Sequence, residues 1–135
     1  MAPVTTTAVR FAPPLIGRGE IDEVVAALES GWLSTGPRVR QFEAAFAAYT
    51  GAPHALALNS CTAALHLALL ASGVGEGDEV ITTPLTFCAS VNSIIHTGST
   101  PVLSDIDPRT IHIVPASVAD ATTPRTRAIV PVHYA

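Results

Sequence analysis

The sequence predicts an α/β fold, part of a three-layer α/β/α arrangement around a mostly parallel sheet. From residue 55 onward, short and strongly apolar segments alternate with longer segments that have helical spacing. Strands this apolar are typical of parallel sheets that helices cover on both faces. Hydrophobic residues make up 48% of the 135 residues and charged residues 13%, which favours a packed interior over disorder.

The first part of the chain predicts an irregular arm and two helices. Residues 1–19 are rich in proline and threonine and are expected to form an N-terminal arm. A helix is predicted from Glu20, with Gly31 at its end, because four apolar residues share one helical face. They are Ile21, Val24, Val25 and Leu28. Pro37 suits the first turn of a second helix, which Gly51 ends.

Four strands and three helices are predicted beyond this point. The expected strands lie at residues 55–58, 79–83, 101–106 and 127–132. The expected helices lie at residues 61–72, 86–97 and 115–121. A turn is expected at residues 107–110, where aspartate and proline follow the third strand. Residues 20–135 would form one large domain, expected to be incomplete because the sequence stops directly after a strand.

Composition argues against several classes of partner. A net charge of −4 gives no reason to expect binding to nucleic acid or to an anionic membrane. The longest apolar run, residues 63–71, is too short to span a bilayer. Cys61 and Cys88 lack the spacing of a disulfide framework, and no secretory signal precedes them, so a cytoplasmic location is expected. The histidines have no zinc-site spacing, and no metal site is expected.

The most informative motif is NSCT at residues 59–62, between a predicted strand and a predicted helix. The first N–H groups of a helix, together with its dipole, attract a phosphate, and Thr62 can add a hydroxyl group. The same residues also suit an ordinary helix cap. Both interpretations stay open on this turn alone.

Phe87 follows the second of these predicted strands and is expected at the same edge of the sheet as Thr62. An aromatic ring at that edge can stack on a flat heterocycle, or it can belong to the hydrophobic core. The pair Asp105 and Asp107 has the spacing of a metal-binding DxD motif, but the proline that follows favours a turn.

Five motifs in order resemble the DegT/DnrJ/EryC1/StrS family of sugar aminotransferases. They are SGWLSTGPRVRQFE, NSCTAALHLAL, GEGDEVITTPLTFCAS, PVLSDIDPRT and AIVPVHYA. The resemblance implies the N-terminal part of a fold-type I enzyme that uses pyridoxal 5'-phosphate (PLP) and works as a homodimer. Residues 20–135 would be the incomplete large domain of such an aminotransferase.

The resemblance also implies two groups of site residues. Those that bind the cofactor are Cys61 and Thr62, at the phosphate, and Phe87, which stacks on the ring. Those of the loops that border the substrate pocket and the dimer interface are Thr35, Gly36, Pro37, His133 and Tyr134. Asp105 and Asp107 do not match the family's aspartate that pairs with the cofactor nitrogen.

The sequence contains no lysine, and all seven of its basic residues are arginines. Enzymes of this kind bind their cofactor covalently through a lysine amine. No catalytic residue is therefore assigned, and the chain by itself is expected to be inactive, the first part of a larger catalyst.

For the parent protein, the resemblance implies amino transfer, with glutamate as the usual donor, to a keto sugar linked to a nucleotide. Three alternatives stay open. A sugar dehydratase and an aminohydroxybenzoate-type synthase share this scaffold. The chain can also be a non-catalytic remnant that acts as a binding module.

Overall fold

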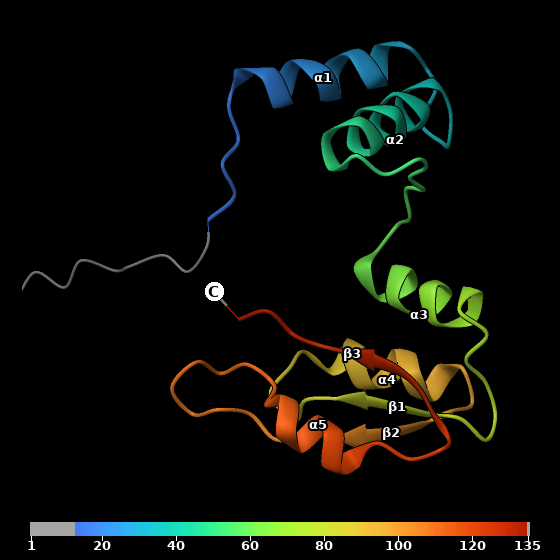
Figure 1. Ribbon diagram of the computed structural model, residues 1–135. Coiled ribbons are helices and arrows are strands. Elements are labelled where there is room, and N and C mark those ends of the chain that lie inside the picture. Colours follow the sequence, from blue (N-terminus) through green and yellow to red (C-terminus); the bar gives the residue numbers. More distant parts are fainter. Residues whose placement is uncertain (1–12, 135) are drawn as a thin grey trace, which may run out of the picture. The chain divides into compact units, whose positions relative to one another are not determined.

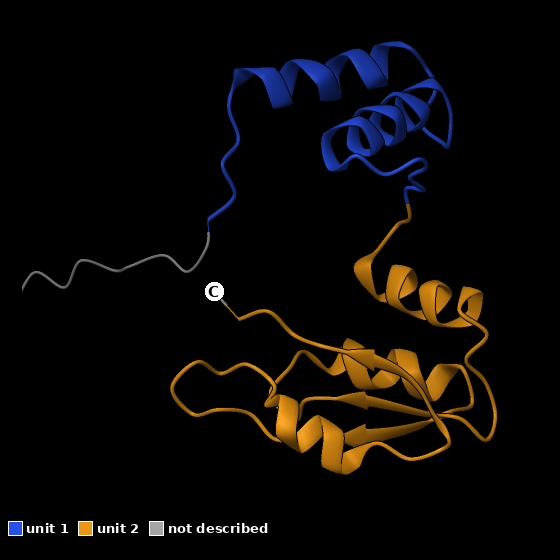
Figure 2. Cartoon of the chain, viewed as in Figure 1, with its two compact units in different colours: residues 1–57 blue, residues 58–135 orange. Residues whose placement is uncertain are grey.

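The computed structural model describes residues 13–134, which fall into two compact units, one up to residue 57 and the other from residue 58 (Figure 2). Most of the predicted arm, residues 1–12, lies outside the described residues. The division into an arm and an incomplete large domain stays a prediction. Within the described residues, no helix is long and apolar enough to cross a membrane.

The first unit contains the two predicted helices, α1 (Arg18–Glu29) and α2 (Pro37–Thr50). Helix α1 begins two residues earlier than predicted, because the Glu20 carboxylate accepts a hydrogen bond from the Gly17 N–H at 2.7 Å and closes the first turn. Gly51 has a φ of 71° and ends α2, a left-handed conformation that glycine adopts without steric cost.

The second unit alternates helices and strands (Figure 1). In chain order they are α3 (Cys61–Ala71), β1 (Glu79–Thr82), α4 (Cys88–His96), β2 (Thr100–Leu103), α5 (Pro115–Ala121) and β3 (Thr126–Val130). The three strands form one parallel sheet in the order β2-β1-β3. The predicted α/β fold with a parallel sheet is confirmed.

The strand order determines where the connecting helices lie. The connection through α4 runs from β1 to its neighbour β2, whereas the connection through α5 passes back over β1 to reach β3. Right-handed crossovers in opposite directions place α4 and α5 on opposite faces of the sheet. Helix α4 packs on β1 and β2, and α3 packs against α4.

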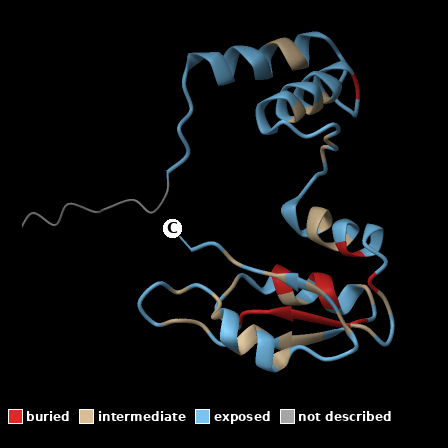
Figure 3. Cartoon of the chain, viewed as in Figure 1, coloured by how far each residue is buried: buried red, intermediate tan, exposed pale blue. Residues whose placement is uncertain are grey.

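The hydrophobic core of the second unit centres on β1, all four residues of which are buried (Figure 3). Val80 packs with Leu69 of α3, Val74 of the following loop and Ile94 of α4. Val80 and Ile94 are fully buried, as expected for a middle strand and the helix that covers it.

One predicted strand is absent. Residues 55–58 are not part of any strand, and neither edge strand of the described sheet pairs with them. The Ala57 N–H instead donates to the Glu43 carboxylate at 2.9 Å, and Leu56 is 76% exposed. Apolar residues favour a strand, but a strand forms only where a second one supplies its hydrogen bonds.

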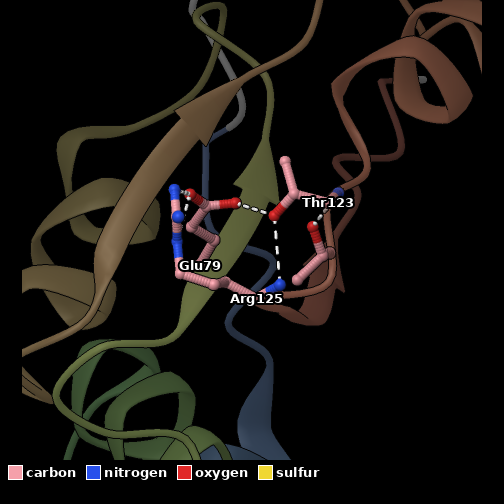
Figure 4. Close-up of polar contacts among 4 residues, drawn as sticks. Glu79, Thr123 and Arg125 are labelled. Atoms are coloured by element: carbon pink, nitrogen blue, oxygen red, sulfur yellow. Dashed lines mark hydrogen bonds and ion pairs between the residues drawn. The ribbon is translucent and has the colours of Figure 1, made fainter.

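A buried carboxylate joins β1 to the segment that leads into β3 (Figure 4). Glu79, the first residue of β1, accepts hydrogen bonds from the Thr123 hydroxyl at 2.5 Å and from Arg125 Nε at 3.0 Å. The Arg125 guanidinium also forms an ion pair with it. The bond from Thr123 and then those from Arg125 hold the pKa of Glu79 below its ordinary value of 4.5.

Candidate functional site

The first turns of α3 and α4 lie at the same edge of the sheet. Helix α4 begins after the carboxyl end of β1, and α3 leads through a short loop into the amino end of that strand. Because α3 packs alongside α4 and both return toward the amino ends of the strands, their N-termini lie at the carboxyl edge (Figure 1). Ligands of open α/β sheets bind at this edge.

The N-terminus of α3 contains both a cap and free donors. The Ser60 hydroxyl accepts the Ala63 N–H at 3.1 Å, so this residue is the ordinary helix cap that the sequence allowed. Among residues 13–134, no acceptor contacts the N–H groups of Cys61 and Thr62 or the Thr62 hydroxyl. Cys61 and Thr62 are exposed, and this donor set fits a phosphate group.

Phe87 lies at the start of α4, as its N-cap and not within the helix. Its side chain is 77% exposed and does not belong to the hydrophobic core of the described residues. A hydrogen bond of 2.7 Å between the hydroxyls of Thr86 and Ser90 stabilises this turn. An exposed aromatic ring therefore stands at the edge where Thr62 offers its hydroxyl.

His133 and Tyr134 follow β3 beyond the carboxyl end of that strand. The Nε2 atom of His112, in the loop after β2, lies 2.8 Å from the Tyr134 carbonyl oxygen. The rings of His112 and His133 meet edge to face with centroids 6.3 Å apart. No sequence pattern connects His112 with a segment 22 residues later, so this contact was not predictable from the sequence.

The loop with Thr35, Gly36 and Pro37 lies in the first unit. Gly36 is buried, and the Trp32 indole N–H donates to the Thr35 carbonyl at 3.0 Å. A cavity of about 390 Å³ adjoins this loop. It is lined by Glu23, Ser30, Trp32, Ser34, Gly36, Pro37, Arg38 and Gln41.

The aspartates of the DxD motif form a turn, as predicted. The Asp107 carboxylate accepts the Arg109 N–H at 2.7 Å and lies 3.5 Å from its guanidinium. These bonds, the backbone one first, hold the pKa of Asp107 below its ordinary value. The Asp105 carboxylate accepts the N–H of Ile106 at 2.8 Å.

A parallel sheet with helix N-termini and an exposed aromatic ring at its carboxyl edge defines an α/β protein that is suited to a phosphate-bearing ligand. The model of the DegT/DnrJ/EryC1/StrS aminotransferase family matches residues 14–135. The chain belongs to this family.

Several known proteins are similar to this chain in sequence or in structure. The spore coat polysaccharide biosynthesis protein SpsC of Bacillus subtilis (strain 168) is 62% identical over 124 residues, which cover 92% of this chain and 32% of SpsC. Spr1654 of Streptococcus pneumoniae, a proposed sugar aminotransferase solved in a PMP form, is 43% identical with a TM-score of 0.85. The match covers 91% of this chain and 31% of Spr1654, which has also been solved in a PLP form.

A third similar protein is 3-amino-5-hydroxybenzoic acid synthase, whose structure is known. It is 44% identical with a TM-score of 0.82, over 89% of this chain and 32% of the synthase. The chain thus spans about a third of the length of these proteins.

Proposed function

We propose that the whole protein is a PLP-dependent sugar aminotransferase. It transfers an amino group from an amino-acid donor, glutamate, to a keto sugar linked to a nucleotide. The main support for this proposal is that the N–H groups of Cys61 and Thr62 and the Thr62 hydroxyl are free to donate at the carboxyl edge of the sheet. The exposed ring of Phe87 lies at the same edge. The similarity of the chain to the PLP form of Spr1654 supports PLP as the cofactor.

In this proposal the chain binds and orients the cofactor. The two free N–H groups and the Thr62 hydroxyl hold the phosphate, whose negative charge the positive end of the α3 dipole stabilises. Phe87 covers one face of the ring. When bound, the cofactor supplies the electron sink that amino transfer requires.

The two remaining groups of residues are proposed to border the substrate. His133 and Tyr134 lie at the same edge of the sheet as Cys61 and Thr62. The loop of Thr35, Gly36 and Pro37 adjoins a cavity with hydroxyl, carboxylate, amide and indole groups, a lining that suits a carbohydrate. We further propose that the whole protein is a cytoplasmic homodimer, as the family resemblance implied.

A second candidate is an aminohydroxybenzoate-type synthase. It is favoured by the similarity to 3-amino-5-hydroxybenzoic acid synthase, whose identity to this chain is 44%, against 43% for Spr1654. Amino transfer to a nucleotide-linked keto sugar, measured with the whole protein, separates the two. Conversion of a carbocyclic ketone without any sugar product would favour the synthase.

The cofactor site is tested in the whole protein with Thr62→Val and Phe87→Ala. Loss of one hydrogen bond to a charged phosphate is worth roughly 1.5–3 kcal/mol, so Thr62→Val is expected to weaken PLP binding about 10- to 150-fold. Phe87→Ala should weaken it as well, through loss of stacking. Retention of PLP is followed by its visible absorbance during dialysis.

Matched controls are Thr50→Val and Phe42→Ala, which change a threonine and an exposed phenylalanine of α2. Both should retain the cofactor as the unmodified protein does. Undiminished PLP affinity in both site variants would overturn the assignment of Cys61, Thr62 and Phe87.

A further inference from the structure

The loop between β2 and α5, residues 104–114, is tightly closed on itself. Ile106 and Ile113 form an isolated antiparallel bridge. At its tip the Ile111 N–H donates to the Asp107 carbonyl at 2.7 Å, and the Asp107 N–H donates to the His112 carbonyl at 3.0 Å. The loop is therefore a folded hairpin with a fixed tip, and the backbone of His112 is part of it.

Ile111 has a φ of 62°, the only positive φ of a non-glycine residue among residues 13–134. A β-branched residue rarely adopts this left-handed conformation, which persists only where surrounding bonds enforce it. Here the two backbone bonds between Asp107 and residues 111–112 enforce it. Ile111 immediately precedes His112, so its enforced conformation determines the direction in which the His112 side chain leaves the backbone.

The imidazole of His112 reaches the segment beyond β3. Its Nε2 atom lies 2.8 Å from the Tyr134 carbonyl oxygen, and its ring contacts that of His133. A carbonyl oxygen can only accept, so Nε2 must carry the hydrogen. Neutral His112 is therefore the Nε2–H tautomer, and because the protonated form also donates from Nε2, the bond survives protonation.

We propose that His112 is a positioning residue for the segment after β3. By donating from Nε2 to the Tyr134 carbonyl, it holds residues 131–134 against the loop of residues 104–114. It thereby sets where His133 and Tyr134 stand at the carboxyl edge. The bond itself is independent of the proposed function, and only the placement of these two residues beside a substrate rests on it.

The test uses the isotope-labelled chain without cofactor or substrate, so its outcome does not depend on whether the protein transfers amines. His112→Phe retains a ring but removes the donor, whereas His112→Gln places an amide donor at about the reach of Nε2. His54→Phe, at an exposed histidine of the other unit, is the control. The order of the His133 and Tyr134 backbone is measured by the heteronuclear NOE of their amides, together with the tautomer of His112.

We expect His112→Phe to lower the heteronuclear NOE of the His133 and Tyr134 amides, because the segment loses the bond to the Tyr134 carbonyl that orders its backbone. Amides of β1 and β3 should keep their values, and His112→Gln should restore those of His133 and Tyr134. Unchanged values in His112→Phe, or no rescue by His112→Gln, would overturn the proposal. A protonated Nδ1 with a bare Nε2 in the unmodified chain would also overturn it, and this measurement needs no variant.

Discussion

At the scale of single residues, the start of α3 contains both a helix cap and free hydrogen-bond donors, supplied by different residues. Ser60 uses its hydroxyl to cap the helix, as its bond to the Ala63 N–H shows. The cap leaves the N–H groups of Cys61 and Thr62 without an acceptor among the described residues. The helix cap and the proposed phosphate site therefore do not exclude each other, because different residues would supply them.

Gly36 is required for space and not for its backbone conformation. Its φ of −172° is extended, which any residue can adopt. A Cβ atom at this position would lie 2.2 Å from the Trp32 indole nitrogen, so a side chain cannot be added unless the indole moves. The absence of a side chain at Gly36 allows this close approach of the indole.

We predict that Gly36→Ala displaces the Trp32 ring and breaks its hydrogen bond to the Thr35 carbonyl. The loss should be about 1 kcal/mol of stability, the typical net value of one hydrogen bond. Trp32 is the sole tryptophan of the sequence, so its fluorescence reports the change without interference. The emission maximum should move to longer wavelength, and acrylamide quenching should increase.

Gly19→Ala is the matched control, because a Cβ atom there meets nothing within 4 Å. It lies within α1, where alanine replaces glycine favourably, and should leave the tryptophan emission unchanged. Identical emission spectra for Gly36→Ala and the unmodified chain would contradict the packing of Trp32 over Gly36.

At the scale of elements, the contact of Glu79 with Thr123 and Arg125 fastens two strands at their amino ends. Glu79 begins β1, and its partners lie 44 and 46 residues later, just before β3. A buried carboxylate is costly unless it is paired and hydrogen-bonded, and both conditions are met. The contact therefore favours the pairing of β1 with β3 over other arrangements.

This contact predicts a specific pH dependence. Because the pKa of Glu79 is lower in the folded chain than its ordinary value of 4.5, ionised Glu79 stabilises the fold fully above that value. The stabilisation is lost as pH falls through the lower, folded-state pKa. We predict that Glu79→Gln melts at a lower temperature than the unmodified chain at pH 7, and that the difference shrinks toward pH 3.

Glu29→Gln, at an exposed carboxylate of α1, is the control. Thermal melting followed by circular dichroism between pH 3 and pH 7, values that bracket the ordinary carboxyl range, measures all three proteins. A constant difference between Glu79→Gln and the unmodified chain over this range would show that ionisation of Glu79 is not the cause.

At the scale of the whole molecule, the absence of lysine has a direct chemical consequence. Covalent capture of an aldehyde cofactor needs a primary amine, and the sequence of 135 residues offers only its N-terminal α-amino group. In the proposed function, Cys61 and Thr62 bind the cofactor phosphate by hydrogen bonds and form no covalent bond to it. Amino transfer is therefore proposed for the whole protein and not for this chain.

We predict that the 135-residue chain, mixed with PLP and reduced with borohydride, forms no stoichiometric adduct. Intact mass spectrometry should show the unmodified mass, and no amino donor should be converted. A lysine-containing PLP enzyme treated in parallel should show the mass increase. A single, site-specific adduct on this chain would refute the consequence drawn from its missing lysine.

The helices, the order of the apolar segments and the turns were predictable from the sequence alone. Helical hydrogen bonds connect residues four apart, so the spacing of apolar residues and the glycines at helix ends suffice to predict them. The NSCT motif and Phe87 were recognisable because both follow predicted strands. Their shared edge was expected from the direction of parallel strands, but the strand predicted before NSCT is absent, and α3 begins at that edge because it packs alongside α4.

Only the tertiary structure decided which apolar segments are strands and which polar residues meet. Residues 55–58 are as apolar as a strand, yet no neighbour in the described sheet pairs with them. The contacts of Glu79 with Arg125 and of His112 with Tyr134 join residues 46 and 22 positions apart. Such contacts depend on how the sheet assembles, and no local pattern of side chains encodes them.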